Sequence, residues 1–213
     1  RSASAAYAWL MLILLFPVGG LILYLLIGSP KLSGKRRLQQ KIFDQSIGDD
    51  IKYLHSQSSF SSILSPVLSQ RYTAIATLNE RLGGLPVCGG NDFELLPHYY
   101  AAIDRIVSDI DLAENYIHVE YYIFSIDETG SKIIEALGRA VKRGVKCRVL
   151  IDHIGTLFEI KEVLRRLRDM GVEAHRMLPV DVFDNEWSRL DLRNHRKIVV
   201  IDGRVGYTGS QNL

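Results

Sequence analysis

Residues 5–27 carry no charged side chain, and a run of this length favours a membrane-spanning helix. As one helix the segment reaches about 35 Å, enough for a hydrocarbon core of about 30 Å. Trp9 and Tyr24 stand near its two ends, as interfacial aromatic residues do, and Pro17 predicts a kink between them. The sequence therefore predicts a single transmembrane anchor within residues 1–30.

A cleaved signal peptide is the alternative, but its apolar part is shorter and positive charge precedes it. Here a basic cluster follows the apolar segment instead, and the positive-inside rule then places everything downstream in the cytoplasm. The cluster consists of Lys31, Lys35, Arg36, Arg37 and Lys41. Residues 31–84, basic at first and then Ser-rich, are expected to form a juxtamembrane linker with helical pieces, the clearest at residues 71–82.

Helical and strand patterns alternate in residues 85–213. Helices are indicated by apolar side chains at helical spacing, and strands by short runs of β-branched and apolar residues. The predicted helices are residues 98–115 and 131–143, and the predicted strands are residues 116–124, 145–152 and 172–178. Strands alternating with helices of this length predict an α/β layered domain with a largely parallel sheet.

A further helix is expected after the strand that ends at Asp152 and His153. Thr156 and Glu159 have the spacing of a capping box at its start, and Gly171 marks its end. Sites of α/β proteins often open where such a strand ends. For Asp152 and His153, however, a turn leading into the helix is the favoured interpretation.

Residues 195–213 depart from the alternation of strands and helices, because their sequence predicts a β-hairpin. Asp202 and Gly203 are a strong signal for a two-residue type I′ turn, in which both central residues have positive φ. This turn pairs Ile201 with Arg204 in the predicted register.

Because side chains alternate along a strand, the predicted register places His195 and Lys197 on one face. The residues of the second strand expected on the same face are Thr208, Ser210 and Asn212. Asp202 has the opposite parity and is expected chiefly to shape the turn. Solvated polar residues at an exposed strand end are the alternative explanation of this pattern.

Such a cluster suits a phosphate. The His195 imidazole can attack phosphorus and form a covalent phospho-histidine, while the Lys197 ammonium and nearby amide donors hold the phosphate oxygens. Arg193 either reaches the same phosphate or faces water. Glu120 either lines the site or is a satisfied buried polar group. This chemistry needs no metal and no other cofactor.

Composition bears on the partner and the compartment. The formal net charge of +2 gives no strongly cationic surface, so nucleic acid is not an expected partner. The chain has two cysteines, and Cys147 lies in a predicted strand, where a thiol is usually a small buried hydrophobe. A reducing compartment fits this usage best.

Residues 195–212 resemble the H-x-K-x4-D-x6-G-S-x-N signature of the phospholipase D superfamily. The matching positions are His195, Lys197, Asp202, Gly209, Ser210 and Asn212. With the apolar segment and its basic continuation, the chain resembles the bacterial cardiolipin synthases over essentially its whole length. The resemblance implies an α/β fold, a phospholipase D-like layered sheet domain forming one half of the enzyme, preceded by an N-terminal transmembrane helix.

The resemblance also implies an activity, with phosphatidylglycerol and membrane lipids as partners. Two phosphatidylglycerol molecules would give cardiolipin and glycerol through a phosphatidyl-histidine, at the cytoplasmic side of the bacterial inner membrane. The implied catalytic residues are His195, Lys197 and Asp202, with His195 as nucleophile, and the implied phosphate-binding residues are Ser210 and Asn212. Arg193, two residues before His195, is the further candidate for phosphate binding. The alternatives are a phospholipase D-type hydrolase, another phosphatidyltransferase of the superfamily, and a non-catalytic membrane assembly protein.

Family members normally carry two copies of the motif, whereas this chain has one. The second half is therefore expected beyond Leu213 or from a homodimeric partner. Residues 85–213 alone are expected to be a truncated first half, inactive by themselves.

Overall fold

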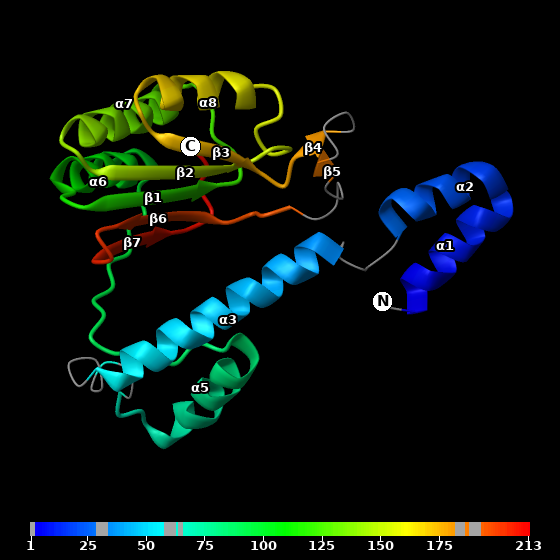
Figure 1. Cartoon of the computed structure of the whole chain (residues 1–213), viewed down its shortest axis with the longest axis horizontal. Coiled ribbons are helices and arrows are strands. Elements are labelled where there is room, and N and C mark those ends of the chain that lie inside the picture. Colours follow the sequence, from blue (N-terminus) through cyan, green and yellow to red (C-terminus); the bar gives the residue numbers. More distant parts are fainter. Residues whose placement is uncertain (1–2, 29–33, 58–62, 64–65, 182–185, 188–192) are drawn as a thin grey trace. The chain divides into compact units, whose positions relative to one another are not determined.

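In the computed structural model, whose helices and strands are drawn in Figure 1, internal contacts group the residues into two compact units. Residues 29–95 belong to one unit, and the other groups residues 2–28 with residues 96–213. The residues that the structure describes are 3–28, 34–57, 63, 66–181, 186–187 and 193–213.

The apolar N-terminal segment forms two short helices and a π-helical turn. They are α1 (Ala3–Leu15), α2 (Pro17–Leu23) and η1 (Tyr24–Gly28). The kink expected at Pro17 is a break, because Phe16 before it leaves helical geometry with φ −133° and ψ 75°. Proline has no N–H to continue the helical hydrogen bonds, and it is accommodated here at the first position of α2. The prediction of a single kinked helix over residues 5–27 is therefore wrong, because the structure has separate helices there.

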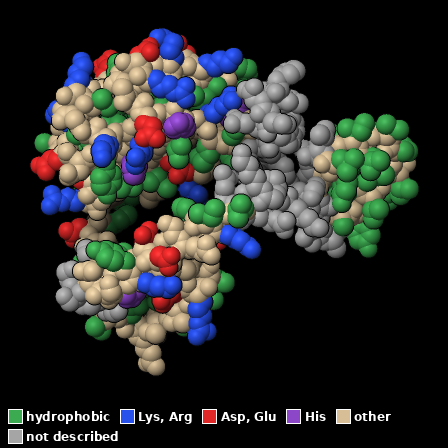
Figure 2. Space-filling model, in the orientation of Figure 1, with side chains coloured by type: hydrophobic (Ala, Val, Ile, Leu, Met, Phe, Trp, Pro, Cys, Tyr) green, Lys and Arg blue, Asp and Glu red, His purple; other side chains and the backbone are tan. Residues whose placement is uncertain are grey.

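Contacts of α1 with η1 and with α2 show that the chain reverses at the break. The rings of Trp9 and Tyr24 meet edge to face with their centroids 5.6 Å apart. A Cβ atom at Gly20 would lie only 2.7 Å from the carbonyl oxygen of Leu12, so glycine permits the close approach. Figure 2 shows hydrophobic side chains over the surface of this hairpin. Among the described residues, no helix combines the length and apolar character needed to cross a bilayer.

The unit of residues 29–95 contains two described helices longer than one turn. In α3 (Gly34–Ser56) the helix is continuous, where only helical pieces were expected. α5 (Gln70–Gly83) confirms the helix predicted for residues 71–82. It ends at Gly84, whose φ of 69° is the left-handed conformation common at helix C-termini.

The α/β part confirms the predicted alternation of strands and helices. Its order is α6 (Tyr99–Leu112), β1 (Tyr116–Tyr121), α7 (Glu128–Lys142), β2 (Lys146–Asp152), α8 (Ile160–Asp169), β3 (Glu173–Met177), β4 (Val180–Asp181), β5 (Glu186–Trp187), β6 (Lys197–Ile201) and β7 (Val205–Thr208). The main sheet has the order β3-β2-β1-β6-β7. β1, β2 and β3 are parallel, and β6 and β7 add an antiparallel pair.

One face of this sheet is covered by α6, α7 and α8, which form a single hydrophobic core with it (Figure 1). The strand side chains on that face include Ile117, Val119, Tyr121, Cys147, Val149, Ile151, Val199 and Ile201, all buried. The alternate side chains of the strands face the other way. They line a hollow of about 340 Å³ bordered by His118, Glu120, Arg148, Leu150, Glu173, His175, Ile198 and Val200.

The terminal hairpin corrects the predicted register by one residue. Asp202 and Gly203 both have positive φ, as expected for a type I′ turn, at 52° and 66°. Ile201 nevertheless pairs with Val205, so Arg204 becomes a third loop residue. A one-residue shift moves every side chain of a strand to the other face. Thr208 consequently pairs with Ile198 and does not share a face with the motif lysine, contrary to prediction.

Candidate functional site

The motif residues lie where β6 begins, beside the last residue of β1. Lys197, the first residue of β6, pairs with Tyr121 at the end of β1. Since β6 is antiparallel to β1, its first residue lies at the carboxyl edge of the parallel strands, where α/β proteins commonly place their sites. His195 precedes β6 and is exposed.

His195 and Lys197 are in direct contact. Lys197 Nζ lies 3.0 Å from Nδ1 and 3.2 Å from Nε2 of His195, and it donates to the His195 carbonyl oxygen at 3.1 Å. Lys197 is only 3% exposed, and its burial lowers the pKa of the ammonium group. A buried cation beside an exposed imidazole can hold an anion while the imidazole attacks it.

Tyr122 is part of the site and was missed by the sequence analysis as a functional residue. Its ring centroid lies 4.5 Å from that of His195, with the planes tilted by 46°. Lys197 Nζ lies 5.2 Å from the same ring centroid, within cation–π range. The ring therefore contacts both motif side chains. The aromatic run of residues 121–122 at a strand end was the available signal.

Asn212 is bonded to the loop that follows β1, and not to the hairpin ladder in which it was predicted. Its Oδ1 accepts a hydrogen bond from the backbone N–H of Ile123, at 3.3 Å, directly after Tyr122. Leu213 continues the pairing, because its N–H donates to the Ile123 carbonyl at 3.3 Å. With Oδ1 engaged, the amide NH2 of Asn212 is the end that can donate to a phosphate. Ser210 is exposed in the segment that follows β7.

Asp202 lies at the far end of β6 from His195. Its carboxylate accepts the backbone N–H groups of Glu114, Asn115 and Tyr116, at 2.9, 2.8 and 2.8 Å. These bonds, that to Glu114 foremost, lower the pKa of Asp202. Its own N–H donates to the Tyr116 carbonyl. Asp202 thus ties the loop of the hairpin to Glu114, Asn115 and the first residue of β1.

Glu120 accepts a short hydrogen bond from the side chain of Asn194, the residue before His195. Its strand parity places it on the face of the sheet that bears His118, where it borders the hollow described above. Glu120 therefore connects β1 to the segment that carries the motif.

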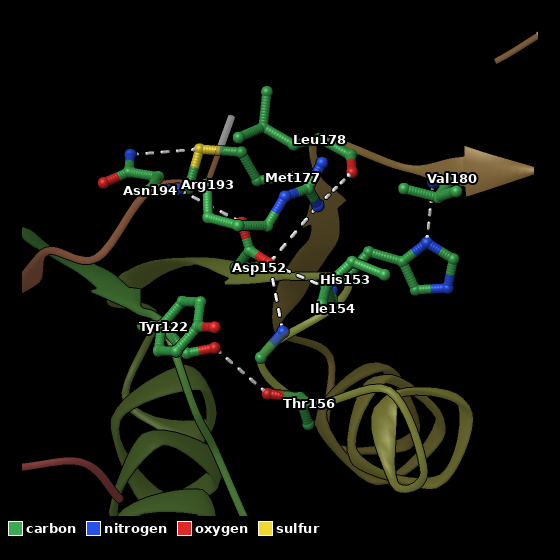
Figure 3. A network of polar contacts seen from close by, with 11 residues as sticks. Tyr122, Asp152, His153, Ile154, Thr156, Met177, Leu178, Val180, Arg193 and Asn194 are labelled. Atoms are coloured by element: carbon green, nitrogen blue, oxygen red, sulfur yellow. Dashed lines mark hydrogen bonds and ion pairs between the residues drawn. The ribbon is translucent and has the colours of Figure 1, made fainter. Parts of the chain in front are cut away.

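Asp152, fully buried at the end of β2, has contacts on two sides (Figure 3). Its Oδ1 accepts the N–H groups of Ile154 and Gly155 at 2.9 and 3.1 Å, which is the turn into α8 that was predicted. Its Oδ2 accepts the N–H of Asn194 at 3.2 Å. Arg193 Nη1 lies 3.5 Å from Oδ1 of Asp152.

Arg193, predicted to bind phosphate, is directed into this network. The same Nη1 donates to the carbonyl oxygen of Leu178 at 2.9 Å, and the side chain is 11% exposed. Figure 3 shows the guanidinium between Asp152 and Leu178. His153, also buried, accepts the N–H of Val180 at its Nδ1, at 2.9 Å.

The predicted capping box at Thr156 and Glu159 does not form. α8 begins at Ile160, and Glu159 at its N-cap makes no capping bond. Thr156 Oγ1 instead accepts the N–H of Phe124 at 3.0 Å, and Glu159 accepts the N–H of Ile126 at 2.7 Å. Both side chains therefore support the loop after β1, which carries Tyr122.

Within the described part of the chain, no group of three or more His, Cys, Asp or Glu residues is arranged to hold a metal ion. The acidic residues of the site each have backbone or side-chain donors as partners instead. Asp152 and Asp202 both accept backbone N–H groups.

Comparison with known protein families gives two matches. The family described as "Cardiolipin synthase, PLD-like domain" matches residues 106–213. The family described as "Phospholipase D-nuclease N-terminal" matches residues 1–29. Together these matches include the α1–α2 hairpin and the whole of the candidate site.

Named relatives match over the full chain. Cardiolipin synthase A of Pectobacterium atrosepticum is 33% identical over 100% of this chain and 43% of its own length. Cardiolipin synthase 1 of Bacillus anthracis is 30% identical over 100% of this chain and 41% of its own length. The chain thus spans less than half of these relatives. Among solved structures, the phospholipase D family member Nuc from Salmonella typhimurium has 25% identity and a TM-score of 0.39, covering 51% of this chain and 62% of Nuc.

Proposed function

Because the chain belongs to the family of cardiolipin synthase, phospholipase D-like domains, we propose that it forms the first half of a phosphatidyltransferase that makes cardiolipin from two phosphatidylglycerol molecules. The observation that carries this proposal is the direct contact between His195 and Lys197, 3.0 Å apart, at the carboxyl edge of the sheet. The names of the relatives that match the whole chain support the choice of lipid substrate.

In the first step a ring nitrogen of His195 attacks the phosphorus of phosphatidylglycerol. The new N–P bond replaces the P–O bond to the head-group glycerol, which leaves as glycerol after gaining a proton. In the second step the head-group hydroxyl of another phosphatidylglycerol attacks phosphorus, loses its proton and breaks the N–P bond. Cardiolipin is the product, and His195 is regenerated.

The other residues of the site have supporting roles. The buried ammonium of Lys197 and the amide NH2 of Asn212 hold phosphate oxygens as charge develops on them, and Ser210 is a further donor. Asp202 fixes the hairpin from its far end through its three backbone hydrogen bonds. The proton for the leaving glycerol comes from a second imidazole, supplied by the second motif of the complete protein or by a homodimeric partner.

We also propose that residues 1–28 attach the protein to the bacterial inner membrane, with the α/β part on the cytoplasmic side. The exposed apolar side chains of α1 and α2 support the attachment, and the family match of residues 1–29 agrees with it. The basic residues that follow the hairpin support the cytoplasmic orientation. Attachment would keep the site close to its lipid substrates.

The test is an assay of the complete protein on phosphatidylglycerol vesicles. Glycerol and cardiolipin should appear in equal amounts, whereas a phospholipase D-type hydrolase would give glycerol and phosphatidic acid. His195→Ala should abolish both products, and a denaturing quench of the wild-type reaction at alkaline pH should trap a phosphorylated histidine that is lost on acid treatment. Unchanged turnover of His195→Ala would refute the covalent mechanism.

A further inference from the structure

The position of His195 is not set by the sheet itself. The ladder of β6 begins at Lys197, so His195 lies outside the strand hydrogen bonds that fix its neighbours. Its ring is exposed and is contacted by Lys197 Nζ and by the ring of Tyr122. A nucleophile must be held close to its attack geometry, because a misplacement of about 1 Å can cost about 100-fold in rate. Contacts of the residues before it can restrain its main chain further.

Both preceding residues are held by one buried carboxylate. Oδ2 of Asp152 accepts the N–H of Asn194, and Oδ1 lies 3.5 Å from Nη1 of Arg193. A turn into α8 requires only the bonds from Ile154 and Gly155. The contacts to Arg193 and Asn194 are additional, and they join the end of β2 to a segment 41 and 42 residues further along the chain.

The contacts of Asp152 with Arg193 and Asn194 are supported by charge and by burial. Asp152 is 0% exposed and the Arg193 side chain 11% exposed, so the two charges lie together away from water, where removing either one is costly. The Leu178 carbonyl fixes the guanidinium from a third direction. Asn194 is held a second time through its side chain, which donates to Glu120. Two adjacent residues are thereby anchored to the ends of β1 and β2.

We propose that Asp152 is a positioning residue for the nucleophile, acting through Arg193 and Asn194 to fix the main chain at His195. This inference rests on the proposed function only in taking His195 as the reacting group. It also assigns Arg193 to positioning and not to the phosphate contact expected from the sequence.

The kinetic test compares Asp152→Asn with a matched control, Asp127→Asn, in the complete protein. Asp127 caps α7 by accepting the N–H groups of Thr129 and Gly130, and thus resembles Asp152 as a turn-forming carboxylate. For Asp152→Asn we expect kcat on phosphatidylglycerol to fall about 100-fold, with KM changed less than about 3-fold. The control should keep kcat within about 2-fold. Equal kcat values for the two variants would overturn the proposal.

A double-mutant cycle with Arg193→Gln tests whether the two residues act together. If they form one positioning unit, the double variant should be no slower than the slower single variant. If Arg193 instead binds the substrate phosphate, Arg193→Gln should raise KM and its effect should multiply with that of Asp152→Asn. The second result would contradict the proposal.

A third readout does not depend on turnover. In protein labelled with ¹³C at the histidine Cε1, the His195 signal is identified by its loss in His195→Ala. We expect Asp152→Asn to shift or broaden this signal in the absence of lipid, and Asp127→Asn to leave it in place. An unmoved signal in Asp152→Asn would reject positioning even if the enzyme were inactive on phosphatidylglycerol. Should Asp152→Asn fail to fold, Arg193→Gln removes the other member of the ion pair and supports the same two measurements.

Discussion

Lys197 brings a positive charge into a position where 3% of its surface is exposed, beside the imidazole of His195. Burying an ammonium group costs stability because the charge is removed from water, and this desolvation lowers its pKa. Proteins keep a buried charge of this kind where it has a function. A bound phosphate would place a negative charge beside the ammonium group of Lys197. Stability and activity should therefore respond in opposite directions to the loss of this cation.

Lys197→Met tests that expectation, because it keeps the length of the side chain and removes the charge. We expect transfer activity to fall at least about 100-fold, while the free energy of unfolding at pH 7 stays equal or rises. Since the folded pKa of Lys197 lies below its ordinary value of 10.5, the stability of the wild type should increase as pH rises between the two values. Any stability gap to Lys197→Met should close over that range in urea denaturation. A variant less stable than the wild type at pH 7 would contradict this account.

Tyr122 contacts both His195 and Lys197 through its ring, so the ring face and not the hydroxyl should matter. Tyr122→Phe should keep kcat within about 3-fold, whereas Tyr122→Leu should lower it about 10-fold, since such ring contacts contribute about 0.5–1.5 kcal/mol. Steady-state assays of both variants on phosphatidylglycerol measure this. Equal losses in the two variants would show that the hydroxyl is the important group.

At the scale of the element, the β6–β7 hairpin depends on the anchor at Asp202. Asp202→Asn keeps one carbonyl oxygen but turns an NH2 group toward backbone N–H groups, beginning with that of Glu114. We expect the free energy of unfolding at pH 7 to fall by about 1–3 kcal/mol. The folded pKa of Asp202 lies below its ordinary value of 3.8, so this contribution is present above pH 3.8 and is lost as pH falls through the folded pKa.

Denaturant titrations of Asp202→Asn and of the wild type between pH 7 and pH 2 provide the measurement. The two curves should converge at acid pH. Asp92→Asn, which changes an exposed carboxylate, is the matched control and should remain within about 0.5 kcal/mol of the wild type throughout. A constant difference between Asp202→Asn and the wild type down to pH 2 would exclude a contribution from the ionised carboxylate.

The turn between β2 and α8 supports the loop that carries Tyr122. A Cβ atom at Gly155 would lie 2.1 Å from the carbonyl oxygen of Tyr122, so an alanine must displace that backbone. For Gly155→Ala we expect a loss of about 1–3 kcal/mol in the free energy of unfolding and a lower kcat. Gly206→Ala is the control, because its Cβ would meet open space. Urea unfolding and turnover of phosphatidylglycerol should show lower stability and lower kcat for Gly155→Ala than for the control. Equal stability and equal kcat in the two variants would argue against close packing at Gly155.

Sequence reasoning could predict the elements whose signals are local. The helical spacing in residues 99–112 and the strand pattern in residues 146–152 were sufficient for α6 and β2. The hairpin register depends on Asp202 bonding residues 86 to 88 positions away, and the capping side chains of Thr156 and Glu159 bond residues 32 and 33 positions away. Such partners leave no trace in a local pattern.

The residues of the candidate site also differ in whether a local sequence pattern could predict them. His195 and Lys197 are close in sequence, and strand periodicity predicted that they share a face, although His195 precedes β6. Tyr122 and Asp152 come from other strands, and only the fold brings them to the motif. In the apolar segment, hydropathy could predict the apolar character of residues 5–27 but not the break before Pro17.

At the scale of the whole molecule, the proposed lipid chemistry requires the site to stay at a membrane surface. Leu10 and Leu14 lie one turn apart on α1 and are 57% and 73% exposed, as expected for side chains in contact with lipid. The basic residues after the hairpin would add an electrostatic attraction to anionic lipid, which salt screens. Apolar insertion and electrostatic attraction should therefore differ in their dependence on salt.

Cosedimentation of the complete protein with phosphatidylglycerol vesicles separates the two contributions. Replacing Leu10 or Leu14 by glutamate should weaken partitioning at least about 10-fold at both low and high salt, because burial of a leucine is worth about 1.5–3 kcal/mol. Neutralising Lys35, Arg36 and Arg37 together should weaken partitioning at low salt and have little effect at high salt. If the glutamate variants bound as tightly as the wild type, the α1–α2 hairpin would not be the element that enters the lipid, and the site would need another means of reaching its substrate.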